Sequence, residues 1–149
     1  MEAVRSQAHN PVQTASRGLN IGLWALQVVF GAVFIGAGLM KIGTAQADIL
    51  AMGDQMAWAG RMPEGLIKFI GVAELAGGLG LILPAATRIK TWLTPLAAAG
   101  LFTVMVLAAG HHLMYGELGL IVPNVVMATF LGLIAFGRHK VAPIVSRSA

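Results

Sequence analysis

The chain of 149 residues has the length of one domain, but 57% of it is hydrophobic and only 11% is charged, whereas ordinary soluble domains carry about 25% charged residues. Its net charge of +4 does not indicate a nucleic-acid partner, because the basic residues gather at the edges of apolar blocks, where positive charge sets membrane topology. The sequence has no cysteine, which excludes disulfides, iron–sulfur clusters and thiol chemistry by this chain.

Four apolar blocks are long enough, or nearly so, to cross a bilayer as helices, which takes about 20 mainly apolar residues. None alternates apolar and polar residues as barrel strands do, and hydrophobicity on all sides favours helices in lipid. We therefore predict an all-α fold, a four-helix transmembrane bundle, with a tail at 1–18, a membrane domain at 19–137 and a basic tail at 138–149. The predicted helices are 19–41, 63–83, 92–111 and 118–136.

The connection from Lys41 to Met62 contains two short apolar stretches, 49–52 and 56–59. These stretches are expected to form a short helix in the membrane interface. Pro63 is expected to be the first residue of the second helix, where its missing N–H costs nothing, and Pro84 is expected to end that helix.

Small residues at a spacing of four allow helices to approach closely in lipid. Pro95 and Pro123 are expected to kink the third and fourth helices. The small-residue pairs expected to support a compact bundle are Ala32 with Gly36, Ala73 with Gly77, and Ala76 with Gly80.

The distribution of Lys and Arg predicts that both termini are cytoplasmic, since cytoplasmic loops carry the excess of positive charge. Seven basic residues lie on the side of the termini and three on the other side. The seven are Arg5, Arg17, Arg88, Lys90, Arg138, Lys140 and Arg147, and the three are Lys41, Arg61 and Lys68.

Glu74 is a carboxylate inside the apolar block 66–83. An ionised carboxylate in hydrocarbon costs about 2.5–3.5 kcal/mol on insertion scales, so it needs a partner. Glu74 lies eleven residues after Pro63, which at the helical rise places it roughly 16 Å deep, near the middle of the membrane. One interpretation is a structural ion pair with Lys41. The other is a proton carrier or a hydrogen-bond partner for a ligand head group, and the sequence leaves both open.

Polar residues of the other three helices are expected to converge on Glu74 in the same half of the bundle. They are Lys41 of the first helix, His111 and His112 of the third, and Asn124 of the fourth. Adjacent histidines point about 100° apart on a helix, so the pair is not expected to hold one metal ion, while a single haem ligand stays open. No nucleophile triad, phosphate loop or paired carboxylate occurs, so no catalytic or metal-binding residue is predicted.

The first helix ends in Gly38-Leu39-Met40-Lys41, and the second contains Gly71-Val72-Ala73-Glu74 after Pro63. From about Leu23 to Phe136 the chain resembles the DoxX and DoxX-like family of small membrane proteins. The resemblance implies a four-helix bundle in a bacterial or archaeal cytoplasmic membrane, and Lys41 and Glu74 are the positions that match its motifs. Some relatives are subunits of thiosulfate:quinone oxidoreductase, and others are linked to membrane redox and thiol-stress complexes.

The expected function is therefore a non-catalytic or quinone-contacting subunit of a membrane redox complex, with catalysis supplied by partner subunits. A membrane quinone is the expected ligand near Glu74 and Lys41. The expected partners are the lipid bilayer and either other subunits or further copies of the chain, with no nucleic acid. The alternatives are a small proton-coupled transporter that uses Glu74, and a membrane scaffold in which the ion pair only fixes packing.

Overall fold

The computed structural model describes residues 16–147. The predicted tail falls mostly on residues 1–15, which lie outside this range, as do the last two residues. The described residues form helices and no strand: α1 Arg17–Gly43, α2 Gln46–Leu50, η1 Asp54–Arg61, α3 Glu64–Thr87, α4 Leu93–Met114, α5 Leu118–Phe136 and η2 Gly137–Val141. Four of the described helices (α1, α3, α4, and α5 with η2) are long and apolar enough to cross a membrane. The prediction of an all-α, four-helix transmembrane fold is confirmed.

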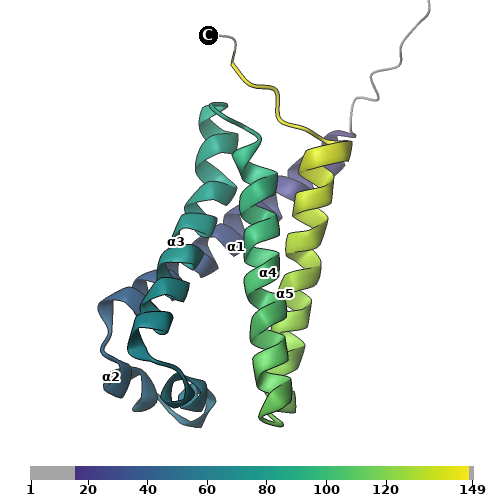
Figure 1. Cartoon of the computed structure of the whole chain (residues 1–149). Coiled ribbons are helices and arrows are strands. Elements are labelled where there is room, and N and C mark those ends of the chain that lie inside the picture. Colours follow the sequence, from purple (N-terminus) through teal and green to yellow (C-terminus); the bar gives the residue numbers. More distant parts are fainter. Residues whose placement is uncertain (1–15, 148–149) are drawn as a thin grey trace, which may run out of the picture.

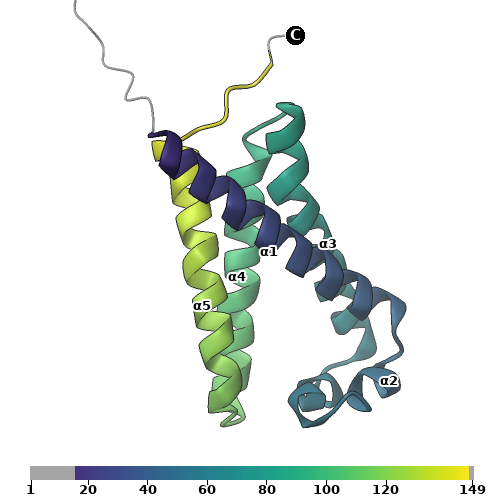
Figure 2. The ribbon, with the colours of Figure 1, turned by 180° about the vertical axis from the view of Figure 1, so that it is seen from behind.

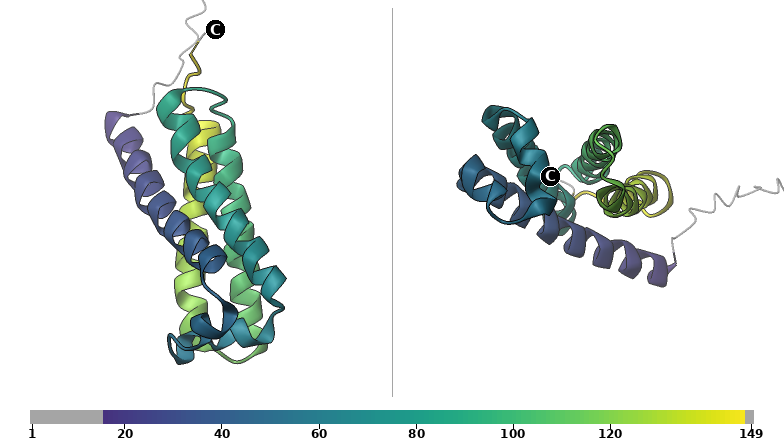
Figure 3. Two further views of the ribbon diagram at one scale, coloured as in Figure 1. Left: turned by 90° about the vertical axis from the view of Figure 1, so that its left-hand side faces the viewer. Right: turned by 90° about the horizontal axis from the view of Figure 1, so that it is seen from below.

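The four long helices form two pairs. α1 packs on α3, and α4 packs on α5 along its length. The pairs meet at the end where residues 16 and 147 lie, which we call the terminal end (Figures 1 and 2). They part toward the other end, the connection end, where α2 and η1 lie. α1 crosses the bundle obliquely, with its first turns beside α5 and its last turns beside α3 (Figure 3).

Glycines set the distance between α1 and α3. A Cβ atom added to Gly38 would lie 2.6 Å from the carbonyl oxygen of Gly71, and one added to Gly78 would lie 2.7 Å from that of Gly31. Such contacts are too short for any larger residue, so the backbones touch directly. The predicted contact residue Gly36 instead faces open space. Small residues occur on two faces of α1, and the spacing alone selected the wrong face.

On the opposite side of α3, small residues meet α4. A Cβ atom on Gly77 would lie 2.6 Å from the Leu101 side chain, and one on Gly80 would lie 2.7 Å from the Cβ of Ala97. These two contacts lie in the half of α3 that is nearer the terminal end. The close packing of α3 on α4 therefore joins the two helix pairs there.

The prolines interrupt the helices less than expected. Pro84 does not end α3, which continues to Thr87 and stops at Arg88, where φ is +58°. A proline removes one intrahelical hydrogen bond, and so close to the helix end only one further turn depends on it. Pro95 lies in the first turn of α4, where N–H groups have no intrahelical acceptor, so it causes no break. Pro123 lies inside α5. Pro63 is the N-cap of α3, one residue before the helix begins.

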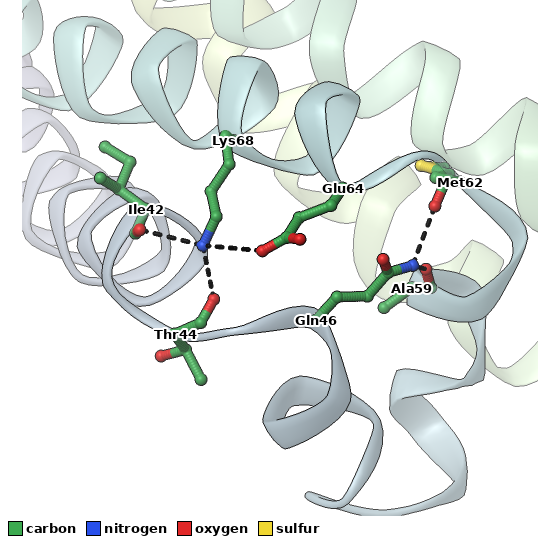
Figure 4. A network of polar contacts seen from close by, with 7 residues as sticks. All are labelled: Ile42, Thr44, Gln46, Ala59, Met62, Glu64 and Lys68. Carbon is green, nitrogen blue, oxygen red and sulfur yellow. Dashed lines mark hydrogen bonds and ion pairs between the residues drawn. The ribbon is translucent and has the colours of Figure 1, made fainter.

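The connection between α1 and α3 folds back on the membrane helices (Figure 4). The Nζ of Lys68 donates to the carbonyl oxygens of Ile42 at 3.0 Å and Thr44 at 2.6 Å. It thereby places a positive charge at the C-terminus of α1, where the helix dipole favours one. Gln46 donates through Nε2 to the carbonyl oxygens of Ala59 and Met62. The short helix predicted here is present as two elements, α2 and η1, and its position in the membrane interface stays a prediction.

A buried polar cluster closes the terminal end. Arg138 is only 3% exposed and donates to Gln27 Oε1 at 2.5 Å, Asn20 Oδ1 at 2.6 Å and the carbonyl oxygen of Ala142 at 3.2 Å. Gln27 in turn donates to the carbonyl oxygen of Leu81. The predicted basic tail at 138–149 thus begins with a residue whose side chain is buried and which lies in η2. The π-helical turn η2 prolongs α5 and carries this residue into contact with α1.

Replacing Gly38 by alanine should destabilise the fold by about 1–3 kcal/mol, because the new methyl group would overlap the backbone of α3. Replacing Gly36, on the same helix but facing open space, should leave stability unchanged or raise it by up to about 1 kcal/mol, since alanine favours helix. Unfolding midpoints in mixed detergent–SDS micelles measure both. Equal effects of the two substitutions would contradict the assigned contact face.

Candidate functional site

A cavity of about 700 Å³ lies between the two helix pairs and extends toward the connection end. Its walls come from α1, α3, α4, α5 and η1, and most of the lining side chains are apolar. All five residues selected from the sequence line it: Lys41, Glu74, His111, His112 and Asn124. Residues from four different helices therefore meet around one space.

Lys41 and Glu74 form an ion pair on the cavity wall, with Nζ 2.7 Å from Oε2. Their side chains are only 12% and 4% exposed. The glycine contact between α1 and α3 makes the pair possible, because a Cβ on Gly71 would lie 2.9 Å from the Cβ of Lys41. Glu74 lies one turn further along α3, on the same face. The ammonium group of Lys41 also lies 5.7 Å from the ring centroid of Trp58.

His111 presents a polar atom without a partner. Its Nε2 is buried and makes no hydrogen bond with any described residue. The ring centroid lies 4.8 Å from that of Tyr115. Buried polar atoms in native proteins are almost always hydrogen-bonded. His111 therefore brings a polar group without a hydrogen-bond partner among the described residues to the lining of the cavity.

His112, by contrast, is already engaged. Its Nδ1 donates to Glu117 Oε2 at 2.8 Å, and the other carboxylate oxygen accepts from Arg61 NH1 at 2.8 Å. Arg61 also lies 4.4 Å from the ring centroid of Tyr115. These contacts join η1 to the turn between α4 and α5, and we call them the Arg61–Glu117 bridge. The two adjacent histidines thus have different roles.

Asn124 lies on α5 at the cavity wall, and its Nδ2 donates to the carbonyl oxygen of Leu120 at 2.6 Å. The described residues contain no group of three or more His, Cys, Asp or Glu side chains placed to hold a metal ion. The sequence interpretation missed Arg61 and Glu117. The sequence did contain a signal for this pair: Arg61 and Glu117 carry opposite charges and lie in the two connections on the same side of the membrane.

Neutralising one member of the buried pair should be costly, because the other charge is left uncompensated. Lys41→Met and Glu74→Gln should each lower the free energy of unfolding by about 3–5 kcal/mol, and the double variant should lose much less than the sum. Glu64→Gln, which removes an exposed carboxylate 3.7 Å from Lys68, should cost about 0.5 kcal/mol or less. Additive losses at Lys41 and Glu74 in detergent unfolding would show that the two residues do not interact.

The Arg61–Glu117 bridge should respond to acid. The hydrogen bonds from His112 and from Arg61 hold the pKa of Glu117 below its ordinary value of 4.5. Because the pKa is depressed in the folded protein, the bridge is fully formed above about pH 4.5 and is lost as the pH falls through the depressed value. In a variant with Trp24→Phe and Trp92→Phe, the emission of Trp58, which lies in η1, should show a transition below pH 4.5.

The same transition should be absent in Glu117→Gln, in which the emission of Trp58 should be independent of pH over this range. Glu64→Gln should retain it, since Glu64 lies outside the bridge. A transition that persisted in Glu117→Gln would assign it to a different carboxylate.

Comparison with known proteins identifies the family. The model of the DoxX-like family matches residues 25–135, which include all five cavity residues selected from the sequence. No curated protein and no solved structure matches the chain. The four apolar helices make the protein a multi-pass membrane protein, and the matched range covers most of the chain, so the chain belongs to the DoxX-like family.

Proposed function

We propose that the protein binds the head group of a membrane quinone in the cavity between its helix pairs, as a membrane subunit of a redox complex. The observation that carries the proposal is the composition of the cavity wall. The wall is mostly apolar and carries a few polar side chains, among them the Lys41–Glu74 ion pair and His111, whose Nε2 has no hydrogen-bond partner among the described residues. Ligand pockets in proteins are typically apolar cavities of about 300–1,000 Å³ with a few polar groups that orient the ligand.

The residues present fit a quinone head group. A quinone has a flat apolar ring and two carbonyl oxygens that accept hydrogen bonds. Lys41 has three N–H donors, and its hydrogen bond with a described residue, to Glu74, uses one of them, so others can donate to a carbonyl oxygen. The Nε2 of His111 supplies a second group, and Phe34, Met105 and Trp58 supply apolar surface for the ring.

Each side chain has a distinct task in this proposal. Glu74 holds the Lys41 ammonium in place and neutralises it, so that the site offers donors without a net charge in the membrane. His111 fixes the orientation of the ring through a second hydrogen bond. The quinone, when bound, supplies two-electron redox chemistry. The chain has no cysteine, so partner subunits supply the thiol or sulfur chemistry with which relatives are associated.

Binding can be measured through Trp58, which lies on the cavity wall and is quenched by a nearby quinone. The variant with Trp24→Phe and Trp92→Phe, in lipid nanodiscs, should show saturable quenching by decylubiquinone. His111→Phe in this background keeps an aromatic ring and removes Nε2. It should weaken binding by up to about tenfold, the effect of one hydrogen bond.

Thr94→Val is the matched control. Thr94 Oγ1 is also buried without a hydrogen-bond partner among the described residues, but it lies outside the cavity. Its removal should leave quinone affinity unchanged. Quenching that rises with quinone concentration without saturating would mean that the quinone only dissolves in the lipid, and it would contradict the proposal. An unchanged affinity in His111→Phe would remove this residue from the site.

A further inference from the structure

We propose that the ligand of this cavity enters from the lipid between α3 and α4, and that its hydrocarbon tail occupies this opening when the head group is bound. This inference rests on the proposed function and goes further. It assigns the route by which the ligand enters, and it assigns the tail to one side of the bundle.

The first observation is the exposure of the cavity rim. Phe69 of α3 and Leu107 of α4 both line the cavity, and each is 68% exposed. No other large hydrophobic residue of the described cavity lining is as exposed. Each of these side chains therefore contacts the cavity on one side and the surrounding lipid on the other, so the wall there is one side chain thick.

The second observation is the course of the two helices. α3 and α4 pack closely through Gly77 and Gly80, on the side of Glu74 nearer the terminal end. Beyond these contacts the helices part toward the connection end (Figure 1). Phe69 and Leu107 lie in the parted region. Facing stripes of apolar residues continue along both helices, with Leu66 and Ala73 on α3 and Val104 and Ala108 on α4.

The third observation concerns the connection end, which is the route from water. Met56, Trp58 and Met62, in η1 and at its end, line the cavity there. The Arg61–Glu117 bridge ties η1 to the turn between α4 and α5. A ligand arriving from water meets these residues of η1 and the charged groups of the bridge. A ligand arriving between Phe69 and Leu107 has only apolar side chains to displace.

The cavity and its opening together restrict the chemistry of the occupant. The polar groups lie inside the cavity, and the opening toward lipid is apolar. A molecule that fits both the polar interior and the apolar opening has a compact head with hydrogen-bond acceptors and a hydrocarbon tail. Lipid tails and apolar side chains are equally good surroundings for such a tail. Moving the tail from lipid into the opening therefore contributes little binding free energy, and the opening selects the tail by its shape. A side chain that fills the opening should compete with the tail for this space.

The test compares decylubiquinone with the same ring lacking a tail, each equilibrated with the protein in nanodiscs and quantified by extraction and absorbance. Leu107→Trp fills the opening. Val106→Trp is the matched control, because Val106 is exposed on the same helix and does not line the cavity. Val33→Trp fills the rim on the α1 side, where Val33 lines the cavity and is 49% exposed. All three positions are exposed, so the larger side chain has room without repacking the core.

Leu107→Trp should weaken binding of decylubiquinone by about tenfold and binding of the tail-less ring by less than about twofold. Val106→Trp and Val33→Trp should change neither. A loss in Val33→Trp alone would place the tail beside α1 and overturn the inference. An equal loss of both ligands in Leu107→Trp would also overturn it, and the proposed function would stand in both cases. If the unmodified protein bound neither quinone, the proposed function and this inference would fall together.

Discussion

The ion pair of Lys41 and Glu74 is the interaction on which the rest of the structure depends. Neither charge can be left alone in hydrocarbon, so α1 and α3 must hold the two groups together. Gly38 and Gly71 make this possible, because their backbones touch and bring the last turn of α1 against α3. The pair therefore determines which faces of the two helices meet. It also places a charged but neutralised group on the wall that the second helix pair faces.

The two helix pairs pack together at the terminal end and part toward the connection end, where η1 spans the gap between them. At the terminal end, Gln27 and Arg138 link α1 to the end of α5 through hydrogen bonds. At the connection end, Arg61 and Glu117 link η1 to the turn between α4 and α5. Between these polar contacts the pairs part and enclose the cavity. A small bundle thereby combines a packed hydrophobic core with a cavity large enough for a ligand.

Much of the fold and the composition of the site follow from the sequence because hydrocarbon penalises unpaired polar groups. Four apolar blocks predict four helices, and a lone carboxylate in one block predicts a partner such as Lys41. Rotation of the helices about their axes cannot be predicted in this way. For this reason Gly36 was chosen over Gly38, and His111 could not be distinguished from His112. The burial of Arg138 was not predicted, because it depends on a π-helical turn that no residue pattern in the sequence indicates.

Whether a quinone binds between the helix pairs can be seen directly in a structure of the protein in lipid nanodiscs with decylubiquinone, determined by electron cryomicroscopy with a rigid antibody fragment to add mass. We expect density for the ring inside the cavity, with a carbonyl oxygen in hydrogen-bonding contact with Lys41 or His111, while Lys41 and Glu74 stay paired. A structure in which the two helix pairs close on each other, with side chains filling the space and the quinone lying outside, would contradict this expectation.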